Sequence, residues 1–342
     1  MGKAYDRRGS AGDTPPVRRA LWRRRRILVP LAALLALVLV AGWMTRSPAP
    51  VGHWDGADGR ERFMRAYQTA FQDMPEVAET FDLRTDYGIV RAYRFAGNPD
   101  GTPTVLLPGR SSASPVWADN MGALLDIGDV YTVDLLGEPG MSVQDRPISS
   151  DEDQAAWLRQ VLEQLPEDGF HMVGLSIGGW AAVNLVLHHP EAVEALSLID
   201  PVFVFDDLPL GTVLRTIPAA FAWMPKSWRD SFTSYTAGGA PVEDVPVAEM
   251  IEAGMQHYAL RLPQPTRIHE DRLEGIEVPV LAIIAGESVM LDPETAVATA
   301  QRSLPRGTVR LYEGASHAVN GEHPEEIARD IAEFLTAQDK TR

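Results

Sequence analysis

Short apolar runs recur along the chain from residue 104 onward, and most are separated by segments with helical periodicity. Strands that are apolar throughout and alternate with helices are typical of a mainly parallel sheet with helices on both faces. The runs lie at residues 104–107, 130–133, 172–173, 196–199, 280–284 and 309–311. The pattern therefore predicts an α/β fold.

Helix signals between these runs support the same fold. Residues 151–165 follow Ser150, which with Asp153 forms a capping pattern, and their apolar positions share one helical face. Residues 324–337 begin with a proline and also have helical periodicity. Upstream, the pattern predicts a helix and two strands around a turn, at residues 61–73, 80–83 and 89–95.

One interval interrupts the alternation. Residues 202–276 are too long for a simple crossover and are rich in aromatic residues and methionine. We interpret this interval as a helical cap over the carboxyl edge of the sheet, because open α/β sheets bind ligands at that edge.

The amino-terminal region differs from the rest. Residues 27–44 are uncharged and apolar and would span roughly 27 Å as a helix, close to the thickness of a bilayer core. Four arginines, at residues 23–26, precede this run and favour a cytoplasmic amino terminus. A cleaved signal peptide ending near residues 40–42 is the alternative, but the length of the run favours an uncleaved anchor.

The predicted organisation is thus a single-pass membrane protein whose main domain lies outside the cytoplasm. The predicted parts are a basic cytoplasmic tail (1–26), a transmembrane anchor (27–44), a linker (45–59) and the main α/β domain (60–342), into which the cap is inserted at about 202–276.

Charge and cysteine content exclude several classes of function. Residues 1–44 hold nine of the 31 basic residues and two of the 47 acidic ones, which leaves 22 basic and 45 acidic residues beyond them. A domain this acidic repels phosphate backbones, so we expect no nucleic-acid partner. The absence of cysteine excludes disulfides, thiolate metal sites and a cysteine nucleophile.

The strongest chemical signal is the pentapeptide Gly-Leu-Ser-Ile-Gly at residues 174–178, which follows an apolar run and precedes a helical segment. A serine hydroxyl is a weak nucleophile and must be exposed at a sharp strand-to-helix turn that faces a base. Gly174 and Gly178 leave room for such a turn. The pattern predicts Ser176 as a nucleophile.

The base should follow the last strand, where a side chain can reach back over the sheet. His317 occupies the loop after residues 309–311 and is the predicted base. The acid should lie between Ser176 and His317 in chain order. We prefer Asp292, and Glu287 and Asp200 remain alternatives.

Two backbone N–H groups are needed to hold the oxyanion of a tetrahedral intermediate. The amide of Ile177, directly after the nucleophile, is the first candidate. The loop after residues 104–107 contains Gly109, which permits a sharp turn, and the amide of Arg110 is the second candidate. We expect neither a metal nor an organic cofactor.

Six separate pieces, in this order and spacing, resemble the α/β-hydrolase fold enzymes, especially capped bacterial carboxylesterases. They are VLLPG (105–109), VYTVDLLGEPGMS (130–142), MVGLSIGGWAAVNLVLHHPEAV (172–193), LSLIDP (196–201), VPVLAIIAGE (278–287) and GASHAVNGEHP (314–324). Two positions depart from the family pattern: Pro108 replaces the usual histidine of the oxyanion loop, and Val289 stands at the usual position of the acid.

The resemblance implies a Ser–His–acid triad and a small-molecule acyl substrate under the cap, with no protein partner predicted. Ester hydrolysis is the expected reaction. Cleavage of a thioester, a lactone or a carbon–carbon bond on the same scaffold is an alternative, because a fold does not select among these reactions. A second alternative is an inactive binding module at the membrane.

Overall fold

The computed structural model describes residues 34–35, 49–219, 226–241 and 245–339. The chain divides into residues 1–49 and a compact unit of residues 50–342. The predicted anchor, residues 27–44, lies outside the described residues except for Leu34 and Leu35. Within the part of the chain that is described, no helix combines the length and apolar character needed to cross a bilayer.

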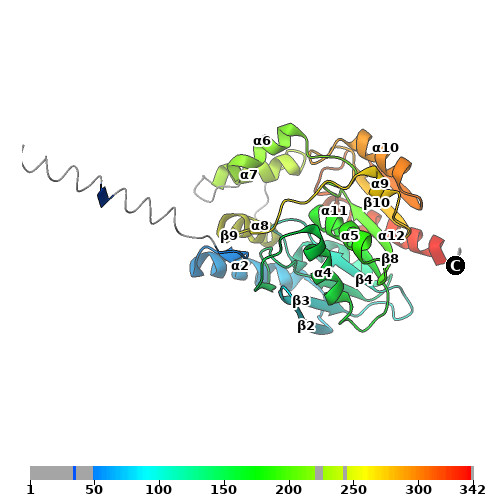
Figure 1. Cartoon of the computed structure of the whole chain (residues 1–342), viewed down its shortest axis with the longest axis horizontal. Coiled ribbons are helices and arrows are strands. Elements are labelled where there is room, and N and C mark those ends of the chain that lie inside the picture. The colour runs from blue at the N-terminus through cyan, green and yellow to red at the C-terminus, as the bar shows by residue number, and fades with distance from the viewer. Residues whose placement is uncertain (1–33, 36–48, 220–225, 242–244, 340–342) are drawn as a thin grey trace, which may run out of the picture. The chain divides into compact units, whose positions relative to one another are not determined.

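A nine-stranded sheet forms the centre of the compact unit (Figure 1). The strand order is β11-β10-β8-β7-β4-β5-β3-β2, and β6 pairs with β3 outside this path. All pairings from β11 to β5 are parallel, whereas β3 pairs antiparallel with β5, β2 and β6. The predicted, mainly parallel sheet is therefore confirmed. The strands are β2 (Glu79–Thr85), β3 (Gly88–Phe95), β4 (Thr104–Leu107), β5 (Val130–Val133), β6 (Val143–Gln144), β7 (Phe170–Leu175), β8 (Val193–Ile199), β10 (Val280–Ala285) and β11 (Gly307–Tyr312).

Helices cover both faces of the sheet because its central strands are buried on both sides. Along β4, Val105 and Leu107 belong to one apolar cluster and Leu106 to another. The first cluster contains side chains from α4, α5 and α10, and the second contains side chains from α3 and α12. These helices are α3 (Ala118–Leu125), α4 (Asp151–Leu162), α5 (Ile177–His188), α10 (Pro293–Ser303) and α12 (Pro324–Asp339). Ser150 caps α4 by accepting a hydrogen bond from the backbone N–H of Asp153, as predicted.

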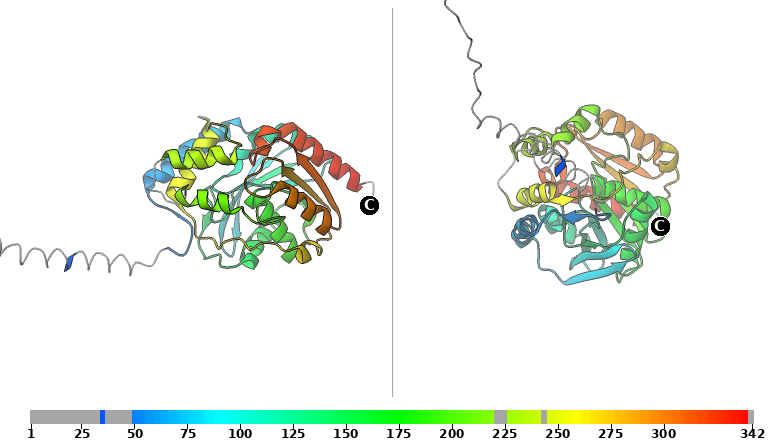
Figure 2. Two further views of the ribbon diagram at one scale, coloured as in Figure 1. Left: turned by 90° about the horizontal axis from the view of Figure 1, so that it is seen from above. Right: turned by 60° about the vertical axis from the view of Figure 1, so that its left-hand side comes forward.

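The interval between β8 and β10 contains the elements of the expected cap, which Figure 2 shows from two further sides. They are α6 (Leu210–Ala219), α7 (Lys226–Thr236), α8 (Pro246–His257), the short strand β9 (Tyr258–Ala259) and α9 (Glu270–Leu273). α8 packs against α2 (Ala57–Ala70) through an apolar cluster that includes Phe63 and Met250. β9 pairs with β1 (His53–Trp54). β1 and the start of α2 thus fall within the predicted linker.

A buried ion pair connects the cap helices to α2. The guanidinium of Arg229 on α7 lies 2.9 Å from Oε1 of Glu252 on α8. Arg62 of α2 lies 3.2 Å from the other oxygen of the same carboxylate. Arg229 is only 1% exposed, so charge neutralisation by Glu252 is needed for its burial.

Candidate active site

Ser176 occupies a strained turn between β7 and α5. Its backbone has φ 54° and ψ −116°, a conformation that a non-glycine residue rarely adopts. A Cβ atom on Gly178 would lie 2.2 Å from the carbonyl oxygen of Leu107, and one on Gly174 would lie 2.5 Å from the carbonyl carbon of Gly178. Neither position accepts a side chain, which explains the spacing of the glycines around the serine.

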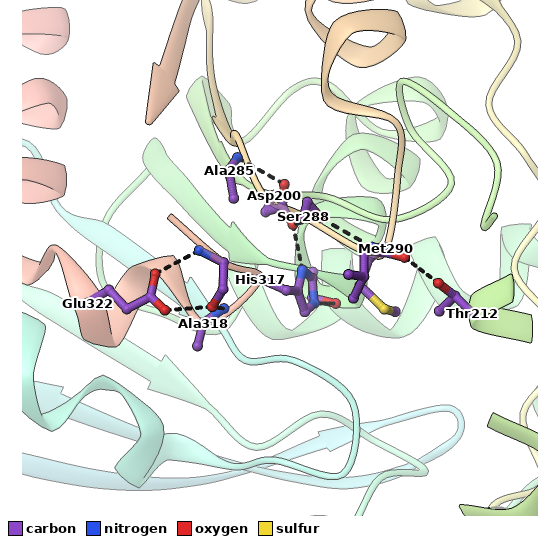
Figure 3. A network of polar contacts seen from close by, with 11 residues as sticks. Asp200, Thr212, Ala285, Ser288, Met290, His317, Ala318 and Glu322 are labelled. Carbon is purple, nitrogen blue, oxygen red and sulfur yellow. Dashed lines mark hydrogen bonds and ion pairs between the residues drawn. The ribbon is translucent and has the colours of Figure 1, made fainter. Parts of the chain in front are cut away.

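His317 faces Ser176 across the carboxyl edge of the sheet. Its Nε2 atom lies 3.0 Å from the Ser176 hydroxyl oxygen, although 141 positions separate the two residues. The loop that carries His317 is held by Glu322, whose carboxylate accepts hydrogen bonds from the backbone N–H of Ser316 at 2.8 Å and from its hydroxyl at 2.5 Å (Figure 3). Ser316 in turn accepts a hydrogen bond from the N–H of Ala318. Both neighbours of His317 are thereby fixed, which limits the positions that the imidazole can take.

Asp200, directly after β8, lies on the other side of the imidazole. Its Oδ2 atom is 2.6 Å from Nδ1 of His317, and the side chain is fully buried. Ser288 donates a hydrogen bond to the same oxygen at 2.6 Å, and the backbone N–H of Ala285 donates to Oδ1 at 3.1 Å (Figure 3). The carboxylate thus has a partner on each oxygen, which lowers the cost of keeping its charge in the interior.

The preferred acid of the sequence analysis, Asp292, does not contact His317. Asp292 is exposed and caps α10, where its carboxylate accepts the backbone N–H of Thr295 at 2.9 Å. That hydrogen bond also lowers the pKa of the Asp292 carboxyl group. Glu287, the second alternative, is exposed. The structure therefore replaces Asp292 with Asp200, the third alternative, as the partner of His317.

The two predicted oxyanion donors lie on segments that border Ser176. Ile177 is the first residue of α5, and its backbone therefore follows the nucleophile into the helix. A Cβ atom built on Gly109 would lie 3.7 Å from the Cβ of Ser176, so the loop that carries Arg110 passes directly beside the nucleophile. No hydrogen bond within the described residues occupies the amide of Arg110.

A small, mostly apolar cavity of about 30 Å³ is lined by both Arg110 and Ile177. Two larger surface hollows, of about 570 and 440 Å³, include neither of these residues nor Ser176, and we do not associate them with the site. The apolar lining of the small cavity comes from the loop after β5, from α4 and α5 and from the segment before α9. It includes Leu135, Leu136, Trp157, Trp180, Leu262 and Pro263.

Comparison with known proteins agrees with this architecture. Residues 104–330, more than half of the chain, match the sequence profile of the alpha/beta hydrolase family. This chain belongs to the α/β-hydrolase family. The predicted resemblance is therefore confirmed, and the arrangement of Ser176, His317 and Asp200 can be considered as a hydrolase site.

Several relatives of known name cover most of the chain. Carboxylesterase YbfK of Bacillus subtilis is 25% identical over 283 residues, which cover 80% of this chain and 93% of the relative. The uncharacterized carboxylesterase nap of the same organism is 24% identical over 289 residues, which cover 82% of this chain and 95% of the relative. A crystal structure of carboxylesterase CesB (YbfK) matches the fold with a TM-score of 0.74 at 24% identity, covering 82% of this chain and 99% of the other.

The residues that hold Ser176, His317 and Asp200 in their positions were not predicted from the sequence. Ser288 and Glu322 contact Asp200 and Ser316, but neither belongs to a recognisable motif. Glu138 was part of the segment GEPGMS, yet nothing in that segment indicated that its carboxyl group is buried beside the loop of Arg110. Such contacts join segments that are distant in the sequence, so only the fold reveals them.

Proposed function

We propose that this protein is a serine hydrolase that cleaves carboxylic esters through an acyl-enzyme on Ser176. The observation that carries the proposal is the unbroken contact chain from the Ser176 hydroxyl through His317 to the buried carboxylate of Asp200. The named relatives are carboxylesterases, which supports esters as the substrate class.

The reaction follows from the positions of these groups. Nε2 of His317 accepts the Ser176 proton as the hydroxyl oxygen attacks the ester carbonyl carbon. Asp200 accepts a hydrogen bond from Nδ1, which fixes the tautomer and stabilises the imidazolium that forms. His317 then gives the proton to the departing alcohol. A water molecule attacks the acyl-enzyme with His317 again as the base, and the carboxylic acid leaves while Ser176 recovers its proton.

The oxyanion of each tetrahedral intermediate would be held by the amides of Ile177 and Arg110. Both belong to segments next to Ser176, and the amino terminus of α5 favours negative charge at the same place. The side chains beside Ile177 and Arg110 are mostly apolar, which supports an ester with an apolar group as the substrate.

The test is to measure hydrolysis of p-nitrophenyl esters of increasing chain length by the full chain and by Ser176→Ala. We expect the variant to lose several orders of magnitude in kcat, and the wild type to be labelled by a fluorophosphonate probe at Ser176 alone. Ester hydrolysis at the wild-type rate by Ser176→Ala would refute the proposal. Labelling without ester turnover would favour a thioester, lactone or carbon–carbon substrate, whereas absence of labelling would favour a binding module.

The position in the cell remains a proposal from the sequence. The apolar run at residues 27–44 and the arginines before it support a membrane anchor with the hydrolase domain outside the cytoplasm. A membrane-impermeant fluorophosphonate applied to intact and to lysed cells tests this. Equal labelling in both supports an outward-facing domain, and labelling only after lysis contradicts it.

A further inference from the structure

A buried carboxyl group lies directly beside the proposed oxyanion loop. Glu138, in the turn after β5, is 2% exposed. Its Oε2 atom accepts a hydrogen bond from the backbone N–H of Ser111 at 3.0 Å, and its Oε1 atom lies 3.7 Å from the guanidinium of Arg110. Neither Glu138 nor Ser111 belongs to the Ser176–His317–Asp200 arrangement, so this contact has no role in the reaction described above.

The loop that Glu138 contacts has a strained backbone. Ser111 has φ 56°, in the left-handed region that favours glycine. Within the loop itself, the only backbone hydrogen bond among the described residues runs from the N–H of Ser112 to the carbonyl of Gly109 at 3.3 Å. A strained conformation persists only where its surroundings enforce it. The hydrogen bond from the Ser111 N–H to Glu138 is one contact that can hold this strained backbone in place.

The cap encloses the same loop from another direction. A Cβ atom on Gly254 of α8 would lie 3.1 Å from the carbonyl oxygen of Ser111 and 2.9 Å from Pro139. α8 therefore packs closely against the carbonyl group of Ser111 and against Pro139. A buried N–H group without an acceptor costs about 1–3 kcal/mol, which is enough to shift a loop this short.

The surroundings of Glu138 have opposing effects on the pKa of its carboxyl group. Burial raises the pKa of its carboxyl group, whereas Arg110 and the N–H of Ser111 lower it. Both the charged and the neutral form retain an oxygen that can accept the Ser111 hydrogen bond. A neutral side chain of the same shape should therefore hold the loop almost as well.

We propose that Glu138 is a positioning residue for ester hydrolysis: its carboxyl group, by accepting the Ser111 N–H, holds the adjacent Arg110 amide where the oxyanion develops. This inference rests on the proposed function and deepens it. Glu138 touches no reacting atom, and it acts only through the backbone of residues 110 and 111.

The experiment compares Glu138→Ala, Glu138→Gln and the control Glu191→Gln in the full chain. Glu191 is an exposed glutamate in the segment between α5 and β8. We expect Glu138→Ala to lower kcat about 10- to 100-fold, somewhat less than deletion of an oxyanion donor, with KM nearly unchanged. Glu138→Gln should restore kcat to within about fivefold of the wild type, because it keeps the acceptor.

A second measurement separates positioning from general damage. A trifluoromethyl ketone forms a tetrahedral adduct whose oxygen imitates the oxyanion, so its affinity for Glu138→Ala should fall by about the same factor as kcat/KM. Equimolar end-point labelling of Ser176 by the fluorophosphonate would show that the variant is folded.

Wild-type kcat in Glu138→Ala overturns the inference, as does an equal loss in Glu138→Gln or in the control. Inhibitor affinity that stays constant while kcat falls also overturns it. These outcomes leave the proposed function intact as long as Ser176→Ala is inactive. Activity in Ser176→Ala, by contrast, would refute the proposed function itself.

Discussion

The hydroxyl oxygen of Ser288 lies 2.6 Å from Oδ2 of Asp200 and donates a hydrogen bond to it. His317 contacts the same oxygen at 2.6 Å, so Ser288 and the imidazole share one carboxylate oxygen. Ser288 belongs to the loop after β10, which is the loop where the sequence resemblance placed the acid. In this chain that loop supplies a hydrogen-bond donor, and the neighbouring strand β8 supplies the carboxylate.

Removal of the Ser288 hydroxyl tests this division of roles. In Ser288→Ala, Oδ2 of Asp200 keeps only His317, and its position is less restricted. We expect kcat to fall about three- to tenfold, because Asp200 is restrained less and an ordinary hydrogen bond contributes about 1 kcal/mol. Steady-state kinetics with a p-nitrophenyl ester gives this value, and the exposed Ser227→Ala on α7 is the control. Unchanged kcat would mean that Ser288 does not help to hold Asp200.

The identity of the acid is tested by substitution at both candidate positions. Asp200→Asn should lower kcat about 10⁴-fold, because an amide can donate to Nδ1 and thereby favour the wrong tautomer of His317. Asp292→Ala should leave kcat unchanged and lower the free energy of unfolding by about 1 kcal/mol through loss of the α10 cap. Activity assays and urea unfolding measure the two effects. A large loss of kcat in Asp292→Ala, with Asp200→Asn active, would reverse the assignment.

The choice between Asp200 and Asp292 shows where sequence reasoning ended. The apolar runs, the glycines around Ser176 and the position of His317 depend on local patterns, and the structure places these elements as expected. The acid depends on which of two neighbouring strand ends approaches the imidazole. β8 and β10 are adjacent and parallel, so both of their carboxyl ends open onto the same edge of the sheet. Asp292 is also a good helix cap, and its capping role removes it from the site.

The first strand and helix of the compact unit, β1 and α2, also begin at positions that the sequence pattern did not predict. The sequence placed a helix at residues 61–73 after a linker, whereas α2 begins at Ala57 and β1 lies at His53–Trp54. β1 exists because it pairs with β9 about 200 positions later. A two-residue strand has no periodicity of its own, so only the partner strand defines it.

A buried histidine outside the site should make stability depend on pH. His171 on β7 is fully buried, and burial lowers the pKa of its imidazole to about 3, below the value near 6.5 of an unfolded chain. The unfolded state therefore binds a proton that the folded state does not, and stability is lost as pH falls below about 6.5. Between pH 7.5 and 5.5 this single group should remove about 1.4 kcal/mol of unfolding free energy.

Urea unfolding of the wild type and of His171→Gln at these two pH values checks the prediction. Glutamine keeps a polar group near the Ser197 hydroxyl, which His171 contacts at 2.8 Å, but does not titrate. The variant should lose about 1.4 kcal/mol less unfolding free energy between pH 7.5 and 5.5 than the wild type does. Ser227→Ala, an exposed position on α7 that carries no titratable group, should keep the wild-type dependence. Identical pH dependence in the wild type and His171→Gln would assign the effect to other groups.

The ion pair between Arg229 and Glu252 should contribute to the stability of the cap and to its contact with α2. In Arg229→Met, Glu252 keeps Arg62 on one oxygen, but its charge stays buried without its main partner. We expect a loss of about 3 kcal/mol in the free energy of unfolding. The double variant Arg229→Met, Glu252→Met should recover most of that loss, because Arg62 is half-exposed and can be solvated. A double-mutant cycle in urea measures both values. A double variant as unstable as Arg229→Met would contradict this explanation. The loss of unfolding free energy would then come from losing the pair itself and not from the unpaired charge of Glu252.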